Sequence, residues 1–374
     1  MVVKTPPMGW NSWNTFGKNI DESLIRETAD AMVDTGLLDA GYNYLVIDDC
    51  WAELERDSEG RLVPSAEKFP NGMKAVADYV HSKGLKFGMY SCAGIYTCAR
   101  YPSSFGYEFI DAETFASWGV DFLKYDYCNK PVDVPGHVLY KRMGLALANC
   151  GRDILLSACS WGRDDTHKWI KSTGSQMWRS TGDIFDNWES VKKLYNIQLE
   201  LQPYNGNGCF NDMDMLIVGM HGNGNVGLGG CTVEEYRTHY SIWAFMNSPL
   251  MIGCDIRNMS EDTKAILTNR EIIAVNQDPA GRQPYLISMN PDFPVWAKHL
   301  DNGDVALAYF NLSDQAFNQY VTWADLGLDR TTGVSLELTD LWTGEKLGVF
   351  DTGFQFGAVP AHGCRILRGR LVRG

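Results

Sequence analysis

The sequence predicts an α/β fold: a (β/α)8 TIM barrel followed by a C-terminal antiparallel β-sandwich domain. Over residues 1–280 short apolar runs alternate with longer stretches of helical period, and after residues 276–279 the runs become short and β-rich. Strands that alternate with helices form parallel sheets through right-handed crossovers. With about eight such units in roughly 280 residues, a closed barrel fits better than an open sheet. We therefore place the two domains at residues 1–280 and 281–374.

The expected elements follow this division along the chain. Barrel strands are predicted at residues 44–47, 85–90, 120–125, 154–159, 177–183 and 249–253. Amphipathic helices are predicted at 22–32, where Asp21 is the N-cap and Gly36 lies near the end, and at 72–81. The second domain has strand-like runs around 295–300, 305–310, 320–323, 334–338 and 364–367, with Gly, Asn and Asp between them at hairpin spacing.

Length and charge restrict the classes of function. The chain has 374 residues, with 33 Lys and Arg against 46 Asp and Glu, and its net charge of −13 argues against nucleic acid or an anionic membrane as main partner. No run reaches the roughly 18 apolar residues of a membrane span, and the first residues lack the apolar segment of a signal peptide. We expect a cytoplasmic protein, or a secreted one if this is a processed form. A homo-oligomer stays open.

The cysteines and histidines do not form a recognisable metal site. None of the 10 cysteines has the Cys-x-x-Cys spacing of a zinc or redox centre, and the 7 histidines are scattered. Most of the cysteines are therefore expected to be buried free thiols, as in a reducing compartment. We expect no metal and no cofactor.

Polar side chains gather at the ends of the predicted strands, where (β/α)8 barrels carry their reacting groups. A single carboxylate after a strand is equally well explained as the cap of the next helix, but a series over six strand ends is not. The sequence therefore predicts the functional site at this face. The residues are Asp48 and Asp49, Tyr90, Lys124 and Asp126, Cys159 and Trp161, Arg179 and Asp183, and Asp212 and Asp214, which precede the run 215–218.

The segment 120–126 suggests a nucleophile. Strand alternation places Lys124 and Asp126 on one face, and a lysine in a partly dry site lowers the pKa of a neighbouring carboxyl, which leaves Asp126 ionised and able to attack. An ion pair inside the barrel is the structural alternative. A Schiff-base aldolase that uses Lys124 is the functional one, although Asp126 would keep that ammonium protonated.

The predicted strand at 177–183 supplies a second carboxylate. The same period aligns Arg179, Thr181 and Asp183, and one ionised carboxylate with one that carries a proton is the pairing that glycoside hydrolysis requires. Asp186 competes for the acid role, but its position fits the start of the next helix. The chain also has 12 tryptophans, several of them near strand ends, which favours a sugar pocket because indole faces pack on pyranose rings.

A glycine-rich run resembles a nucleotide motif. Gly222-x-Gly224-x-x-Gly227 matches the dinucleotide fingerprint, but it lies within a longer glycine-rich segment, and Asn247 stands where the motif needs an acidic residue. We interpret this run as a mobile loop beside the pocket.

Six segments, spread over most of the chain, carry a family resemblance. They are MGWNSW at 8–13, IDDCW at 47–51, KYDYC at 124–128, RSTGD at 179–183, NDMDML at 211–216 and NQDP at 276–279. Together they resemble glycoside hydrolase family 27, which consists mainly of α-galactosidases with α-N-acetylgalactosaminidases as close relatives. The resemblance implies an exo-acting retaining enzyme that needs no cofactor. Its substrates would be terminal α-galactosides of oligosaccharides, galactomannans or glycans.

The resemblance also implies roles for single residues. Asp126 would be the nucleophile and Asp183 the acid/base of a double displacement. Trp13 would stack on the sugar ring, while Asp48 and Asp49 would hold the 6- and 4-hydroxyls. The other implied substrate-binding residues are Tyr90, Lys124, Cys159, Trp161, Arg179 and Asp214. Cys98 and Cys128 match a pair that forms a disulfide at the rim of the pocket in the family.

The segment Cys159-Ser160-Trp161-Gly162 bears on the choice of sugar. Vertebrate N-acetylgalactosaminidases share Ser160, but Arg163 stands where they have a small residue. Cys159 and Trp161 resemble the plant and fungal arrangement that crowds the 2-hydroxyl. We therefore predict an α-galactosidase. α-N-acetylgalactosaminidase activity is the first alternative, and an inactive sugar-binding homologue is a more distant one.

Overall fold

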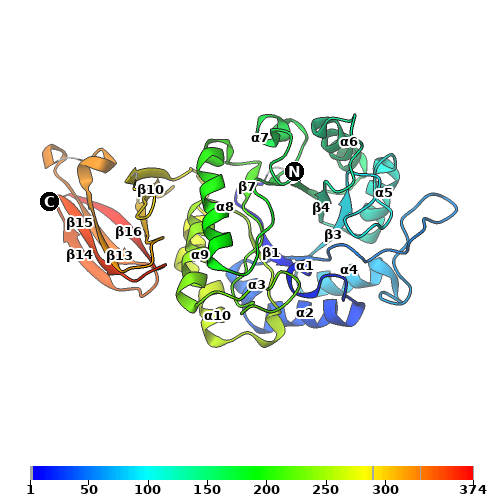
Figure 1. Cartoon of the computed structure of the whole chain (residues 1–374), viewed down its shortest axis with the longest axis horizontal. Coiled ribbons are helices and arrows are strands. Elements are labelled where there is room, and N and C mark those ends of the chain that lie inside the picture. Colours follow the sequence, from blue (N-terminus) through cyan, green and yellow to red (C-terminus); the bar gives the residue numbers. More distant parts are fainter. Residues whose placement is uncertain (1–2, 289, 329, 374) are drawn as a thin grey trace.

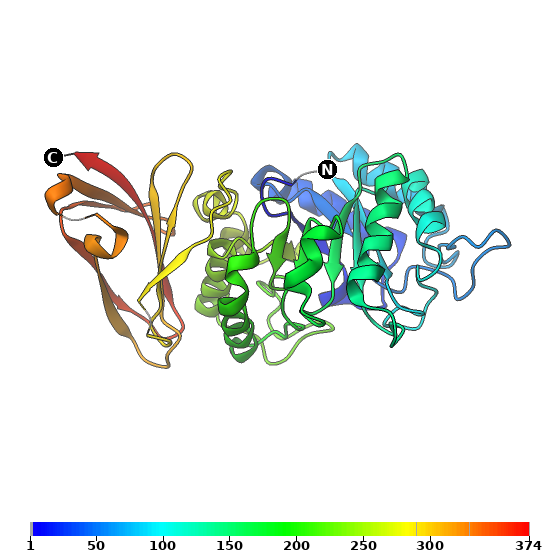
Figure 2. The ribbon, with the colours of Figure 1, turned by 90° about the horizontal axis from the view of Figure 1, so that it is seen from above.

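The computed structural model describes residues 3–288, 290–328 and 330–373. The first domain is an eight-stranded parallel sheet rolled into a barrel and surrounded by helices, and the second combines a six-stranded antiparallel sheet with a two-stranded one. The two domains lie beside each other along the long axis of the molecule, with the C-terminal end on the far side of the second domain (Figure 1, Figure 2). The predicted barrel and β-sandwich are therefore confirmed.

The barrel closes through an irregular contact. Its strand order is β7-β6-β5-β4-β3-β2-β1-β8, and the amide of Leu216 donates to the carbonyl of Met251 (2.7 Å), which joins the segment after β7 to β8. The strand predicted at 177–183 is too long, because β6 ends at Arg179, and β1 and β7 were not among the predicted strands. The strands are β1 (Met8–Asn11), β2 (Tyr44–Val46), β3 (Lys86–Cys92), β4 (Phe122–Asp126), β5 (Leu155–Cys159), β6 (Met177–Arg179), β7 (Phe210–Asp212) and β8 (Leu250–Ile252).

The helices of the barrel begin and end as their local sequence directs. Asp21 caps α2, since its carboxylate accepts from the amide of Leu24 (2.8 Å), and Gly36 follows with a positive φ of 83°. The helices are α1 (Trp13–Phe16), α2 (Glu22–Asp34), α3 (Leu37–Ala40), α4 (Gly72–Ser82), α5 (Glu108–Trp118), α6 (Gly136–Asn149), α7 (Thr166–Trp169), α8 (Trp188–Leu201), α9 (Val233–Phe245), α10 (Glu261–Leu267) and α11 (Arg270–Asn276).

The second domain has the order β14-β13-β16-β11-β10-β9 in its larger sheet, with β12-β15 as the smaller. Five strands were predicted at or near their observed positions, and β9, β14 and β15 were missed. The strands are β9 (Tyr285–Ser288), β10 (Val295–His299), β11 (Val305–Phe310), β12 (Phe317–Thr322), β13 (Val334–Asp340), β14 (Lys346–Phe350), β15 (Gly353–Val359) and β16 (Cys364–Arg373). Short 3₁₀ turns lie at Ile170–Ser172, Gln202–Tyr204, Ile256–Asn258, Trp323–Leu326 and Arg330–Thr332.

The two domains pack directly on each other through β11 and α9. Every residue of β11 is buried, because Leu307 faces the core of the sandwich while Phe310 faces the barrel. The rings of Phe310 and of Phe245 on α9 pack edge to face, with their centroids 6.4 Å apart. Trp342 adds a hydrogen bond from its indole to Ser241 Oγ (3.0 Å). Among the described residues, no helix is long and apolar enough to cross a membrane.

Candidate active site

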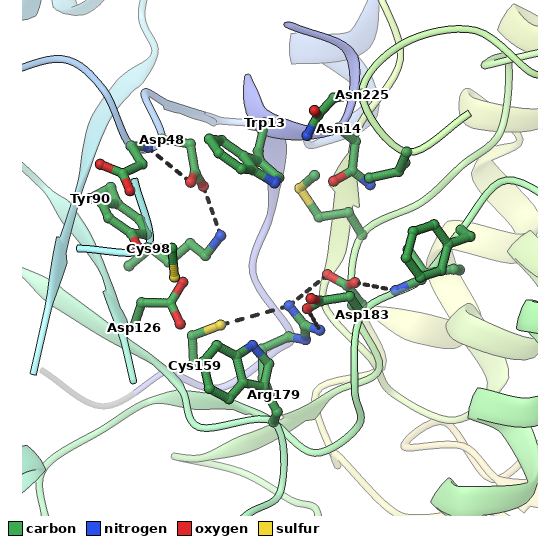
Figure 3. Close-up of a pocket in the computed structure, with 18 residues that line it drawn as sticks. Trp13, Asn14, Asp48, Tyr90, Cys98, Asp126, Cys159, Arg179, Asp183 and Asn225 are labelled. Atoms are coloured by element: carbon green, nitrogen blue, oxygen red, sulfur yellow. Dashed lines mark hydrogen bonds and ion pairs between the residues drawn. The ribbon is translucent and has the colours of Figure 1, made fainter. Parts of the chain in front are cut away.

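A cavity of about 240 Å³ opens at the C-terminal ends of the barrel strands (Figure 3). This volume lies below the range of roughly 300–1,000 Å³ for drug-sized ligands, so the cavity suits a single small ring. All the predicted catalytic and substrate-binding residues line it: Trp13, Asp48, Asp49, Tyr90, Lys124, Asp126, Cys159, Trp161, Arg179, Asp183 and Asp214. Five carboxylates and two cations surrounded by aromatic rings are a lining suited to a polyhydroxylated ligand.

One wall of the pocket is a buried ion pair. Lys124 Nζ donates to Asp48 Oδ2 (2.8 Å), and Asn11 Nδ2 donates to the same oxygen (2.8 Å). Asp49 beside it accepts from the amide of Ala99 (2.9 Å). Burial disfavours the charge on Lys124, but Asp48 and the other acidic groups around it, Cys159 and Asp126, together outweigh burial and raise the pKa of the ammonium above its ordinary value. Lys124 is therefore a fixed cation, which argues against a Schiff-base role.

Asp126 ends β4 and faces the cavity as predicted, but its electrostatic setting differs from the expectation. Burial raises the pKa of Asp126 to about 6 and outweighs the opposite effect of Lys124. The predicted net lowering is thus wrong: Lys124 acts in that direction, but burial outweighs it, and the hydrogen-bonded partner of Lys124 is Asp48. Asp126 Oδ1 accepts a hydrogen bond from the backbone amide of Tyr127 (2.8 Å), which holds the carboxylate in place.

Arg179 lies between two further carboxylates. Its Nη2 is 2.8 Å from Asp183 Oδ1 and its Nη1 is 2.9 Å from Asp214 Oδ1. Burial acts against the charge on Asp183, but Arg179 outweighs it and lowers the pKa of that carboxyl. Asp214 is buried and held by the amide of Ile184 (2.7 Å), whereas 63% of the Asp183 side chain is exposed. Asp214 is therefore held by a cation and a backbone amide, whereas Asp183 is open to solvent and bonded to Arg179.

Two tryptophans border the cavity. Trp13 lies across it from Cys159 and Arg179 in the view of Figure 3, and its amide donates to Asn11 Oδ1 (2.9 Å). Asn11 therefore contacts both the backbone of Trp13 and the ion pair of Lys124 with Asp48. Trp161 adopts a positive φ of 55°, and the guanidinium of Arg163 lies over its ring at 5.1 Å.

The rim carries the disulfide that the resemblance implied. Cys98 and Cys128 are bonded, with a Cα–Cα distance of 5.1 Å, and Cys98 borders the cavity. These two sulfurs and Asp126 form the one group of close potential metal ligands among the described residues, and the disulfide occupies both sulfurs. The other eight cysteines are free, and five of them are buried.

Asp186 has a different place from the one predicted. It neither lines the cavity nor caps a helix, since Asn187 caps α8 by accepting from the amide of Ser190 (2.8 Å). The Asp186 carboxylate is buried and accepts from the amide of Gly222 (2.6 Å) and the hydroxyl of Tyr236 (2.9 Å). It therefore holds the glycine-rich loop, which lies beside the pocket as predicted.

The prediction missed the side of the pocket formed by apolar and amide side chains. The missed lining residues are Asn14, Ile184, Phe185, Met215, Asn225 and Val226. They lie next to motif residues in the chain or on the glycine-rich loop, but their residue types carry no signal of chemistry. Their proximity to motif residues was the only available indication.

Comparison with known proteins places the chain in a family. A family model described as alpha galactosidase A matches residues 5–278, and one described as the alpha galactosidase C-terminal beta sandwich domain matches residues 290–368. The α-galactosidase of Cyamopsis tetragonoloba is 48% identical over 364 residues, which are 97% of this chain and 85% of the relative.

Solved structures agree with this result. α-Galactosidase I of Mortierella vinacea superposes with a TM-score of 0.92 at 39% identity, over 98% of this chain and 97% of that one. An α-galactosidase of Saccharomyces cerevisiae, solved with raffinose, gives a TM-score of 0.90 at 32% identity, over 99% and 98%. The chain belongs to the α-galactosidase family, glycoside hydrolase family 27.

Proposed function

We propose that this chain is an exo-acting retaining α-galactosidase, which removes terminal α-linked galactose through a covalent intermediate on Asp126. The observation that carries the proposal is the contrast between two carboxylates of one small cavity. Asp126 is buried and fixed, as a nucleophile must be, and Asp183 is exposed and able to turn, as a proton donor to a departing group must be.

The shape of the pocket supports exo action. The ion pair of Lys124 and Asp48 lies within the pocket lining, and the Lys124 side chain is 17% exposed while that of Asp48 is 2% exposed. A sugar that reaches this pair has no room for a further residue beyond it. The scissile bond of a terminal galactose would then face the mouth, where Asp183 lies.

The mechanism follows from these positions. Ionised Asp126 attacks the anomeric carbon while the bond to the leaving oxygen breaks and Asp183 supplies the proton. For this step Asp183 must carry a proton, so it must leave its contact with Arg179, which lowers the pKa of the carboxyl. Asp214 still neutralises Arg179 when that happens, so the cation is not left unpaired. Asp183 then takes a proton from water, which attacks the intermediate and releases galactose with retained configuration.

The pocket favours galactose over N-acetylgalactosamine. Cys159 and Trp161 line the cavity on the side that we assign to the 2-hydroxyl, whereas Ser160 is buried and its Oγ is 2.7 Å from Thr166 Oγ1. Ser160 therefore does not provide space for an acetamido group. Arg163 packs over Trp161 and keeps the indole in place.

A pair of chromogenic substrates tests the proposal. We expect the protein, without added metal, to release p-nitrophenol from the α-galactoside with a kcat/KM at least about 100-fold higher than from the α-N-acetylgalactosaminide, because the acetamido group would meet Cys159 and Trp161. A 100-fold difference corresponds to roughly 3 kcal/mol. A preference for the acetamido sugar would contradict the assignment of Cys159 and Trp161. Absence of activity on both would contradict the enzyme itself and favour a sugar-binding protein.

The remaining proposals concern organisation and setting. We propose residues 1–280 and 281–374 as the domains, since α11 ends at Asn276 and β9 begins at Tyr285. The substrates proposed are α-galactosyl oligosaccharides, galactomannan branches or glycan termini. Eight free cysteines favour the cytoplasm, whereas the disulfide at the rim favours secretion as the alternative.

A further inference from the structure

Phe185 is an exposed aromatic side chain at the mouth of the pocket. It lines the cavity, yet 47% of its surface is exposed, and it follows Asp183 by two residues. Single exposed apolar side chains are common, but this one borders the cavity beside Asp183, where a ligand passes. The mechanism above does not use it.

The backbone that carries Phe185 is fixed from several sides. The amide of Phe185 donates to Ser190 Oγ (2.9 Å), and the preceding amide, of Ile184, donates to Asp214 Oδ2 (2.7 Å). The following residue, Asp186, donates its amide to Val226 O (3.0 Å) besides its buried carboxylate contacts. The position of Phe185 is therefore set before a ligand arrives, which lowers the entropic cost of binding.

The glycine-rich loop brings a polar side chain to the same edge. The amide of Asn225 donates to Thr15 O (3.2 Å), and that of Val226 donates to Asn14 O (3.2 Å), so the loop is anchored to the segment after β1. Asn225 is exposed and lines the cavity near Trp13 (Figure 3). Within the described residues its side-chain amide makes no hydrogen bond, so both its donor and its acceptor are available.

We propose that Phe185 and Asn225 bind the first sugar of the leaving group. The oxygen that accepts the proton of Asp183 belongs to the leaving group, so this group must pass the residues beside Asp183 on its way out of the pocket. Phe185 stacks on the C–H face of a pyranose, and the amide of Asn225 bonds to its hydroxyls. The preferred substrates are therefore galactosides of other sugars. This inference rests on the proposed function.

The test compares two leaving groups. Raffinose presents a sugar to Phe185, and α-galactosyl fluoride presents only fluoride. We expect Phe185→Ala to lower the ratio of kcat/KM for raffinose to kcat/KM for the fluoride by about 5- to 10-fold, the effect of losing one aromatic stacking contact. Phe185→Trp, which keeps an aromatic face, is expected to restore most of the ratio. Asn225→Ala should lower it about 3-fold, as expected for one hydrogen bond.

Phe109→Ala is the matched control, since Phe109 is 53% exposed on α5 and lies outside the lining of the cavity. It should keep the wild-type ratio. A wild-type ratio in Phe185→Ala would overturn the inference, and so would an equal loss on both substrates, which would mean that Phe185 supports the galactose pocket. If wild-type protein fails to hydrolyse the fluoride, the proposed function itself fails, which is a separate result.

Discussion

Asp126→Asn is expected to lower kcat on p-nitrophenyl α-galactoside by about 10⁴-fold or more, the scale of removing a group that acts in the chemical step. The carboxamide keeps the size of the side chain but cannot form the covalent ester. Burial works against the charge of Asp126 and raises its pKa to about 6, so a neutral carboxamide of the same size should leave the variant folded. Turnover and thermal unfolding measured together check both statements.

The matched control is Asp153→Asn, the same change at an exposed position just before β5, at the other end of the barrel. It should keep wild-type kcat. Asp126→Asn should still bind galactose, as measured by tryptophan fluorescence. Wild-type-like turnover in Asp126→Asn would remove Asp126 as nucleophile.

The raised pKa of Asp126 also predicts a pH dependence. Attack needs the ionised form, so wild-type kcat/KM should fall as the pH drops below about 6.

Asp183→Asn is expected to act selectively on substrates with poor leaving groups. General acid catalysis contributes about 10²- to 10⁴-fold, so kcat/KM for raffinose should fall by that factor. α-Galactosyl fluoride needs less protonation, so its first step should be far less affected. Release of the sugar then becomes limiting, because the variant also lacks the base that activates water.

Azide distinguishes this role from a merely structural one. It needs no general base, so it should accelerate turnover of the fluoride by Asp183→Asn and give α-galactosyl azide. Wild-type protein should show no such acceleration. An equal loss on raffinose and fluoride, without rescue by azide, would mean that Asp183 serves mainly to hold Arg179.

The fold and the lining of the site could be predicted because both depend on local sequence. Alternating strand and helix patterns gave the barrel, and motif residues at strand ends necessarily meet at one face. Two of the strands that escaped prediction show the limit of this signal. β7 has three residues, and β14 has no fully buried residue, so neither shows a distinctive apolar pattern.

The electrostatics of the site could not be predicted in the same way. The ion pair of Lys124 with Asp48 joins residues 76 positions apart, whereas the sequence pointed to Asp126 only two positions away. The role of Asp186 depends on Tyr236, 50 positions further on. Such pairings follow from the closure of the barrel and the path of its loops, which no local pattern specifies.

Trapping the covalent intermediate tests the central claim most directly. 5-Fluoro-α-galactosyl fluoride should react quickly, because fluoride leaves easily, and the product should hydrolyse slowly, because the fluorine at C5 disfavours the oxocarbenium-like transition state. We predict one added fluorogalactosyl group per chain, located by peptide mass spectrometry on Asp126. An adduct on another residue, or β-galactose as the first product released from an α-galactoside, would contradict retention through Asp126.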